Sequence, residues 1–439
     1  MVFDLHHDSF ILWDSKKSID EEKTMYFIPG YIYKEQDKKG TYLSSWLKEN
    51  RIQIEGKEEE SIIKNLEKGC PNLDTEIKKF LNEQEMLISA EEFNNTLNQA
   101  VQALDKTMIL TLMPTEACNF RCPYCYENHH AITMNESTVK AIKKMIQNQS
   151  EIQKLQINWF GGEPTLCPQI IEEINSLAME KFDINQENFK SFMTTNGFLL
   201  TKEVFMRYYD LGVRTYQITL DGWTHDKTRY LASGEPTLDV ILNNLKEIKS
   251  LPKDYCFKII LRYNILENNR DVSWYNYMNE IFGDDDRYYL TVFAVGDWGG
   301  ESVQSLKLLN SDQEKKEVLE YHKSYIKNLG FEEIPDYPDC VGGGMCHAAY
   351  KNGFVIRANG KIQKCTVALD NPVNDIGYID ENGEVFINDD KNYRWYKPDL
   401  KYSCYTCDKV LKCLNQKCPY SRLKTNNTKY CENEMERFL

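Results

Sequence analysis

The sequence predicts an α/β fold organised around a parallel β-sheet. The main observation is that six strand-like runs alternate with helical patterns between residues 107 and 310. Successive strand–helix units place their strands in parallel, either in a doubly wound sheet or in an open barrel. The second observation is length, because 439 residues exceed one ordinary core and indicate two or three domains. The composition, 41% hydrophobic and 27% charged, is that of a globular protein.

Residues 1–95 are expected to form a small module of their own. Two strand-like runs come first and three helical patterns follow, in the order Phe10–Trp13, Met25–Tyr33, Tyr42–Asn50, Ser61–Lys68 and a helix from Asp74. Strands followed by helices predict a compact α+β domain that is winged-helix-like. The module carries no candidate catalytic residue, and one interpretation of it is a packing domain without a ligand.

Residues 107–310 carry the alternating pattern itself. Strands are expected at Met108–Met113, Leu155–Phe160, Phe189–Met193, Arg214–Leu220, Phe257–Tyr263 and Tyr288–Val295. Helices are expected between them, for example at Glu136–Asn148, Gln169–Lys181, Lys202–Leu211 and Leu238–Lys249. A helical bridge at 311–339 then leads to a C-terminal domain at 340–439. The first strand runs into a cysteine-rich loop, which places that loop at the carboxyl end of the sheet, where parallel α/β folds build active sites.

Charge and cysteine usage limit the classes of function. A net charge of −14 argues against nucleic acid as the main partner, since phosphate binding needs concentrated Lys and Arg. No apolar run approaches the roughly 18 residues that span a bilayer, and the N-terminus lacks signal-peptide features, so no membrane and a cytoplasmic location are predicted. In that reducing compartment fourteen cysteines favour metal or iron–sulfur ligation over disulfides. Three isolated ones, Cys70, Cys167 and Cys256, are expected to be small buried side chains.

The most informative motif is the run Cys118-x3-Cys122-x2-Cys125. A tetrahedral zinc site would need a fourth local Cys or His, whereas a 4Fe–4S cluster held by three cysteines keeps one iron free for a ligand. The loop, with Tyr124 before its last cysteine, resembles the signature of the radical S-adenosylmethionine (SAM) enzymes. The resemblance implies the partial (β/α)6 barrel of that family, a cluster on these three cysteines, and SAM bound at the open iron. A partial zinc knuckle is the alternative.

Further candidate residues follow the predicted strands. The resemblance assigns SAM binding to Tyr124, Gly161, Gly162, Glu163, Thr195, Asn196 and Asp221. The Gly-Gly-Glu-Pro segment that begins at Gly161 would hold the amino end of SAM, because glycines let the backbone approach a ligand and carbonyls accept hydrogen bonds from an ammonium group. Each of these segments also fits an ordinary turn after a strand.

Eight more cysteines lie between Cys340 and Cys431. Their order, Cys346-x13-Gly360-x4-Cys365 and then Cys404-x2-Cys407-x5-Cys413-x4-Cys418, resembles the SPASM domain of radical SAM enzymes that modify peptides, with four residues where that family has three before Cys418. Eight thiolates suffice for two fully ligated 4Fe–4S clusters. The resemblance assigns them to two auxiliary clusters, one on Cys340, Cys346, Cys365 and Cys418 and the other on Cys404, Cys407, Cys413 and Cys431. A pair of zinc sites is the alternative, because C-x2-C-x5-C also fits a zinc ribbon.

Together the two resemblances cover Thr107 to Cys431 and imply an enzyme that modifies a peptide. It would carry three 4Fe–4S clusters and SAM, generate a 5′-deoxyadenosyl radical, and take electrons from an external donor of flavodoxin or ferredoxin type. Its substrate would be a ribosomal precursor peptide whose leader segment adds a strand to the N-terminal module. The sequence as a whole is similar to the streptide-type lysine–tryptophan cyclases, which implies a carbon–carbon crosslink from Lys to Trp. The sequence identifies no catalytic base.

Other outcomes of the same chemistry stay open. Thioether formation, as in sactipeptide maturases, fits the same outline. Oxidation to formylglycine, as in anaerobic sulfatase maturases, is less favoured because Thr366 stands where those enzymes have an Asp base. A protein of a different class would bind peptides through iron–sulfur or zinc sites without turnover. The Gly-Gly-Glu-Pro segment and the three-cysteine loop argue against that class, because neither has a use without SAM.

Overall fold

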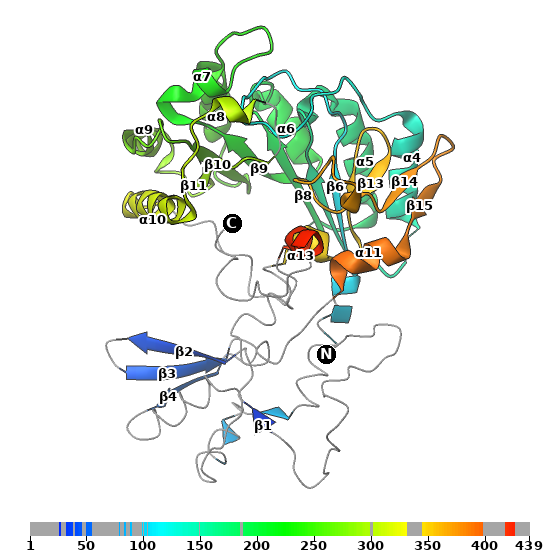
Figure 1. Ribbon diagram of the computed structural model, residues 1–439, viewed down its shortest axis with the longest axis horizontal. Coiled ribbons are helices and arrows are strands. Elements are labelled where there is room, and N and C mark those ends of the chain that lie inside the picture. The colour runs from blue at the N-terminus through cyan, green and yellow to red at the C-terminus, as the bar shows by residue number, and fades with distance from the viewer. Residues whose placement is uncertain are drawn as a thin grey trace. The chain divides into compact units, whose positions relative to one another are not determined.

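A computed structural model describes residues 104–148, 150–184, 188–298, 302–331, 345–397 and 418–425, and before them only short segments, most of them strands (Figure 1). The chain divides into two compact units. The larger unit comprises Lys106–Asp336 and Asn352–Asn392. The smaller one comprises Met1–Asp105, Tyr337–Lys351 and Tyr393–Phe438.

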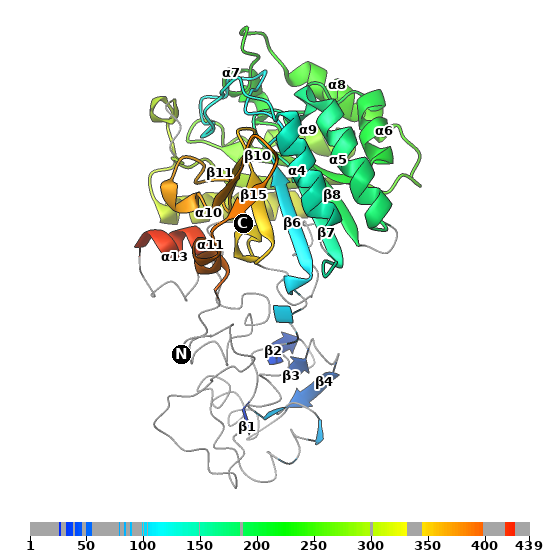
Figure 2. The same ribbon diagram turned by 90° about the vertical axis from the view of Figure 1, so that its right-hand side faces the viewer.

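The larger unit is built on a sheet that begins with six parallel strands. They are β6 (Thr107–Leu112), β7 (Lys154–Trp159), β8 (Phe189–Thr195), β9 (Val213–Thr219), β10 (Lys258–Ile265) and β11 (Tyr288–Ala294). Each strand pairs with its neighbours in the chain, and Figure 2 shows β6, β7 and β8 side by side. A doubly wound sheet would reverse its strand order at a switch point. The predicted partial (β/α)6 barrel is therefore confirmed, with each strand within two residues of its expected bounds.

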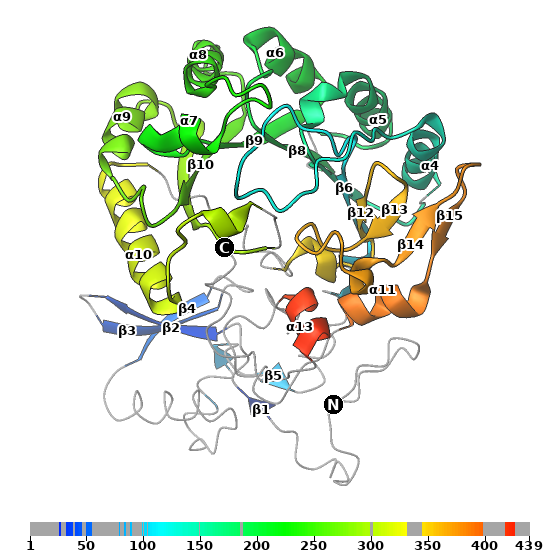
Figure 3. The ribbon, with the colours of Figure 1, turned by 45° about the horizontal axis from the view of Figure 1, so that its top comes forward.

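A helix follows each of these strands and lies on the outer side of the curved sheet (Figure 3). The helices are α4 (Glu136–Gln147), α5 (Pro168–Lys181), α6 (Lys202–Asp210), α8 (Leu238–Lys249), α9 (Ser273–Phe282) and α10 (Asp312–Asn328). Side chains of Asn135, Thr201 and Ser311 cap α4, α6 and α10 by accepting a hydrogen bond from a backbone N–H in the first turn. Within the described ranges no helix is long and apolar enough to cross a bilayer.

The two faces of the parallel strands differ in polarity. On β7, Ile157 and Trp159 are fully buried, and the Trp159 indole N–H donates to Asn175 Oδ1 of α5 at 3.2 Å. The alternate side chains of the same strand, Gln156 and Asn158, are only partly buried. Because successive side chains of a strand point to opposite faces, these amides lie on the inner face, away from the helices. The inner face of the barrel is therefore polar along this strand.

The sheet continues past the barrel through four short strands. They are β12 (Gly353–Ile356), β13 (Lys361–Gln363), β14 (Gly377–Ile379) and β15 (Val385–Ile387). β12 pairs in parallel with β6, with Gly353 opposite Ile109, and the later strands pair antiparallel in sequence. The Met113 N–H donates to Ile356 O at 3.0 Å. This pairing places the residues that follow β12 beside the start of the cysteine loop.

The described residues of the smaller unit include two small antiparallel sheets. Its strands are β1 (Tyr26–Phe27) with β5 (Ile88–Ser89), and β2 (Ile32–Asp37), β3 (Gly40–Ser45) and β4 (Asn50–Ile54). The predicted helix at Tyr42–Asn50 is wrong, since its ends belong to β3 and β4. Leu43 pairs with both Lys34 and Ile52, and such cross-strand pairs override a local helical pattern. The predicted strand at Phe10–Trp13 and helix at Ser61–Lys68 lie outside the described residues.

Candidate active site in the cysteine loop

Cys118, Cys122 and Cys125 lie in the loop between β6 and α4. Figure 3 shows that this loop runs on the inner side of the curved sheet. All three side chains are half-buried. The Cys125 N–H donates to Cys122 O at 3.0 Å, so the last two cysteines share one tight turn, and the Phe120 N–H donates to Cys118 Sγ at 3.4 Å. Burial raises the pKa of the Cys118 thiol to about 12, with the Glu163 carboxylate adding to the effect. The loop thus holds three thiols that need a nearby positive charge to ionise.

This donor set fits an iron–sulfur cluster. Iron supplies the positive charge that deprotonates a coordinating thiol, whatever its pKa in the free protein. Across the described ranges no three Cys, His, Asp or Glu side chains converge closely enough to bind one metal ion. A 4Fe–4S cluster has a different requirement, because each cysteine ligates a separate iron. The three half-buried thiols of this loop could each bind one iron of such a cluster.

Gly161 and Gly162 pack against the backbone that leads into the cysteine loop. The Gly162 N–H donates to Thr115 O at 3.2 Å and the Glu163 N–H donates to Ala117 O at 3.0 Å. A Cβ on Gly162 would overlap the carbonyl of Ala117, and one on Gly161 would lie 2.6 Å from Thr115 O. Gly161 also has a φ of 101°, which other residues rarely adopt. Close approach to this loop requires both glycines, and their binding of SAM stays a prediction.

Glu163 connects the end of β8 to the cysteine loop. It is fully buried, and its Oε1 accepts hydrogen bonds from the hydroxyls of Thr165 and Thr195, each at 2.7 Å. Its Oε2 accepts from the Asn196 N–H at 2.7 Å. Asn196 Nδ2 in turn donates to Asn119 Oδ1 at 2.8 Å, next to the first cysteine. The structure therefore brings three predicted site residues together, with the Glu163 carboxylate occupied by protein groups.

Tyr124 and Asp221, which are 97 residues apart in the chain, form a second buried cluster. The Tyr124 hydroxyl donates to Asp221 Oδ2 at 2.5 Å and accepts from Arg229 Nη1 at 2.9 Å. The Thr228 hydroxyl also donates to Asp221 Oδ2, at 2.7 Å. Burial raises the pKa of Asp221, while the Arg229 guanidinium lowers it. In the described part of the chain, Asp221 Oδ1 and Arg229 Nε are buried without a hydrogen-bond partner, as expected where a polar ligand binds.

Arg229 is a residue that the sequence analysis missed. It follows the short helix α7 (His225–Thr228) in the loop after β9, and its guanidinium lies 5.7 Å from the Phe120 ring of the cysteine loop. The sequence feature that could have identified Arg229 is its position after a parallel strand, at the end of the sheet where such folds bind ligands. A single Arg in a polar loop is too common for that signal to be specific.

A family model for the Radical SAM superfamily matches residues 112–269 of this chain. The chain carries a radical SAM domain. The matched span begins at the last residue of β6 and contains the cysteine loop, the Gly-Gly-Glu-Pro segment, and both buried clusters described above. The predicted barrel therefore agrees with the family match, and the cysteine loop lies within the matched span.

Curated relatives match about a third of this chain. The GTP 3′,8-cyclase of Tolumonas auensis is 33% identical over 143 residues, which cover 31% of this chain and 39% of that enzyme. The mycofactocin maturase MftC of Mycobacterium tuberculosis is 28% identical over 128 residues, which cover 29% of this chain and 31% of that protein. The chain thus spans less than half the length of these two relatives.

A solved structure shares more of the fold. Native anSMEcpe with bound AdoMet and Kp18Cys peptide superposes with a TM-score of 0.51 at 16% identity, over 70% of this chain and 88% of that chain. At this identity the likeness concerns the fold alone. It extends beyond the span of residues that the radical SAM family model matches.

Replacing Tyr124 by Phe should weaken SAM binding by the radical SAM domain. The change removes one hydroxyl and leaves a buried carboxylate and a buried guanidinium each short of one hydrogen bond, which costs about 1–3 kcal/mol. Tyr216→Phe is a matched control, because its buried hydroxyl has no hydrogen-bond partner within the described residues. Denaturant unfolding and SAM dissociation constants should separate the two variants. If both variants changed SAM affinity equally, the Tyr124 cluster would have no specific role in SAM binding.

The predicted auxiliary ligands are described only in part. Cys365 follows β13 and is half-buried, and Asn374 hydrogen bonds to both its N–H and its C=O, each at 2.8 Å. Cys346 is exposed at the start of a short 3-10 helix, and Cys418 is half-buried before α13 (Pro419–Thr425). The others lie outside the described residues: Cys340, Cys404, Cys407, Cys413 and Cys431. The two auxiliary clusters therefore stay a prediction.

The isolated cysteines give a mixed result. Cys167 is buried, as expected for a small apolar side chain. Cys256 is exposed, so the prediction for it is wrong. It lies in the loop before β10, outside the alternation that buries residues of the strand itself. Cys70 lies outside the described residues.

Proposed function

We propose that this protein is a radical SAM peptide maturase. It generates a 5′-deoxyadenosyl radical and forms an intrapeptide carbon–carbon crosslink, from Lys to Trp, in a ribosomally made precursor peptide. The observation that carries the proposal is the three-cysteine loop after β6, which the Gly-Gly-Glu segment fixes from one side and Asn196 from another. These contacts give the loop a defined conformation at the end of the sheet where such folds bind ligands.

Different residues of the site would bind the cluster, SAM and the substrate. When bound, the cluster and SAM supply the radical that takes a hydrogen atom from an unactivated carbon. The three thiols of the loop would hold the cluster. The free oxygen of Asp221 and the free N–H of Arg229 would orient polar groups of SAM, because both atoms are buried beside the loop. The partly buried amides of Gln156 and Asn158 would face the substrate from the inner side of β7.

Relatives and composition favour a peptide as substrate. The solved structure of anSMEcpe holds a peptide together with AdoMet, and the Mycobacterium tuberculosis relative is a maturase. Joining two carbon atoms removes two hydrogens from the peptide, one as a hydrogen atom and one as a proton, and releases one electron. Two auxiliary clusters on the eight C-terminal cysteines would accept that electron. Residues 1–95 would bind the leader of the precursor, and a flavodoxin or ferredoxin would reduce the first cluster.

A second candidate is a small-molecule cyclase. The 33% identity with GTP 3′,8-cyclase favours it, although the matched segment is only 31% of this chain. A match of that length does not fix the substrate, because one fold serves enzymes with different substrates. The eight cysteines after position 340 favour the peptide substrate.

The test is to assay the anaerobically reconstituted, reduced protein with SAM and with each substrate class. One arm contains short Lys- and Trp-containing precursor peptides encoded beside its gene, and the other contains GTP. We expect 5′-deoxyadenosine and a peptide that has lost two hydrogen atoms, located by tandem mass spectrometry between Lys and Trp. Conversion of GTP would support the second candidate. Detection of a thioether link in the peptide would support a peptide maturase but contradict the proposed carbon–carbon crosslink. Stoichiometric zinc in place of iron would contradict both enzymes.

A further inference from the structure

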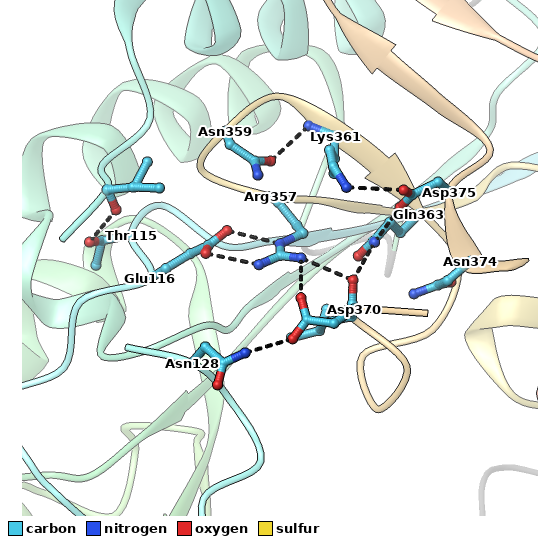
Figure 4. A network of polar contacts seen from close by, with 12 residues as sticks. Thr115, Glu116, Asn128, Arg357, Asn359, Lys361, Gln363, Asp370, Asn374 and Asp375 are labelled. Atoms are coloured by element: carbon cyan, nitrogen blue, oxygen red, sulfur yellow. Dashed lines mark hydrogen bonds and ion pairs between the residues drawn. The ribbon is translucent and has the colours of Figure 1, made fainter. Parts of the chain in front are cut away.

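Arg357 forms a buried cluster of ion pairs and hydrogen bonds at the base of the cysteine loop (Figure 4). Its Nε and Nη2 donate to the two carboxylate oxygens of Glu116 at 2.8 and 2.9 Å. Its Nη1 donates to Leu369 O at 3.0 Å and to Asp370 Oδ1 at 3.2 Å. Arg357 is 5% exposed and Glu116 is 2% exposed. All three nitrogens of this buried guanidinium thus have acceptors, and of these Asp370 is the exposed one, at the edge of the cluster.

The cluster joins the two ends of the cysteine loop. Glu116 stands two residues before Cys118, at the loop's entry. At the exit, three residues after Cys125, Asn128 Nδ2 donates to Asp370 Oδ2 at 2.8 Å. The path Glu116–Arg357–Asp370–Asn128 therefore closes a ring with the loop that carries all three thiols (Figure 4).

The same guanidinium reaches the loop after Cys365, a predicted ligand of an auxiliary cluster. Leu369 and Asp370 belong to that loop. It is braced by Gln363, whose Nε2 donates to Leu369 O at 2.7 Å, and by the two hydrogen bonds between Asn374 and the backbone of Cys365. One side chain thus connects both predicted cysteine loops of the larger unit.

The fold explains why Arg357 lies there. Parallel pairing of β12 with β6 ends at Ile356 opposite Leu112. The residues that follow these two strands therefore leave the sheet side by side. Arg is suited to the position because its planar fork satisfies a carboxylate with two N–H groups and still has donors for other acceptors. A Lys could supply the charge but not this geometry.

We propose that Arg357 is a positioning residue for the SAM-cleaving site. It holds the entry and the exit of the cysteine loop at a fixed separation, and it fixes that loop relative to the loop of Cys365. The effect on catalysis rests on the proposed function, whereas the effect on the conformation of the loop does not.

The test compares Arg357→Lys with Arg287→Lys. Arg287 is a matched control, because it is also 5% exposed and donates through Nε and Nη2 to both oxygens of the buried Asp285, at 2.9 and 2.7 Å, before β11. Both variants lose a buried two-point ion pair and should lose similar stability. We expect hydrogen exchange of residues 113–130 in the cluster-free protein to accelerate about tenfold in Arg357→Lys and to stay unchanged in Arg287→Lys.

The reconstituted proteins supply the second readout. Arg357→Lys should lose iron to a chelator faster, show an altered electron paramagnetic resonance signal on addition of SAM, and form 5′-deoxyadenosine at least about tenfold more slowly than Arg287→Lys. Unaltered exchange in residues 113–130 would overturn the proposal, even if activity falls. A wild-type protein that binds no cluster would overturn the proposed function instead, and the exchange experiment would still decide the role of Arg357.

A milder variant covers the case in which Arg357→Lys fails to fold. Asp370→Asn keeps the Arg357–Glu116 pair, and the Asp370 side chain is 58% exposed, so folding should persist. We expect faster exchange at the exit of the loop, around Asn128, and little change at its entry. If Asp370→Asn changed hydrogen exchange equally at the entry and the exit of the loop, the result would contradict the proposed ring of contacts.

Discussion

Replacement of Cys118, Cys122 and Cys125 together by Ala should abolish formation of 5′-deoxyadenosine. The three thiols share one loop at the carboxyl end of β6, and the family model that matches this span is that of radical SAM proteins. Without thiolates the loop has no ligand for iron, so no electron can reach SAM. The iron content should fall by about four per chain, the content of one cluster, and any auxiliary clusters should remain.

The control for this variant is Cys256→Ala. Cys256 lies in the same matched span but is exposed and isolated from the loop, so its loss should change neither iron content nor SAM cleavage. The measurement is iron and sulfide per chain together with 5′-deoxyadenosine by chromatography, under anaerobic reducing conditions. Undiminished SAM cleavage in the triple variant would exclude the loop as the site.

Gly162→Ala should disable the site without touching a cysteine. The added methyl would overlap the carbonyl of Ala117 and would lie 2.8 Å from Glu116 O, and both neighbours are backbone. A backbone cannot rotate away as a flexible side chain can, so the entry of the cysteine loop must shift. A displacement of about 1 Å near reacting groups costs about 10²-fold in rate. Overpacking of this kind also destabilises a protein by about 1–3 kcal/mol.

Gly377→Ala separates the local effect from the loss of stability. Its methyl would overlap the carbonyl of Phe386 between β14 and β15, so the clash is of the same kind but lies outside the three-cysteine loop. We expect similar unfolding free energies for the two variants, and normal iron content and SAM cleavage only for Gly377→Ala. If both variants lost activity to the same extent, global destabilisation would be the explanation and the contact of Gly162 with the loop would be incidental.

The barrel was predictable because its signals are local. Strands such as β7 bury alternate side chains, as Ile157 and Trp159 show, and the helices α4, α6 and α10 have side-chain caps such as Asn135. These features recur at fixed short spacing, so the sequence indicates them without knowledge of the fold. The cysteine loop was predictable for the same reason, since its three thiols occur within eight residues.

The wrong predictions concern features that depend on residues distant in sequence but close in the fold. The pattern at Tyr42–Asn50 fits a helix, yet the pairing of β3 with β2 and β4 makes its first part a strand. Cys256 looks like a small buried residue by type, but its exposure depends on a loop outside the strand period. Local patterns contain no information on either outcome.

The sequence by itself determined the αβ repeat, the place of the three-cysteine loop at the end of the first barrel strand, and the residue types available at the following strand ends. Only the tertiary structure decided how these residues are connected. Tyr124 and Asp221 are 97 positions apart, and Glu116 and Arg357 are 241 apart. Such pairs form because parallel strand pairing brings distant loops to one edge of the sheet, where burial makes each charged group depend on a partner that its own segment cannot supply.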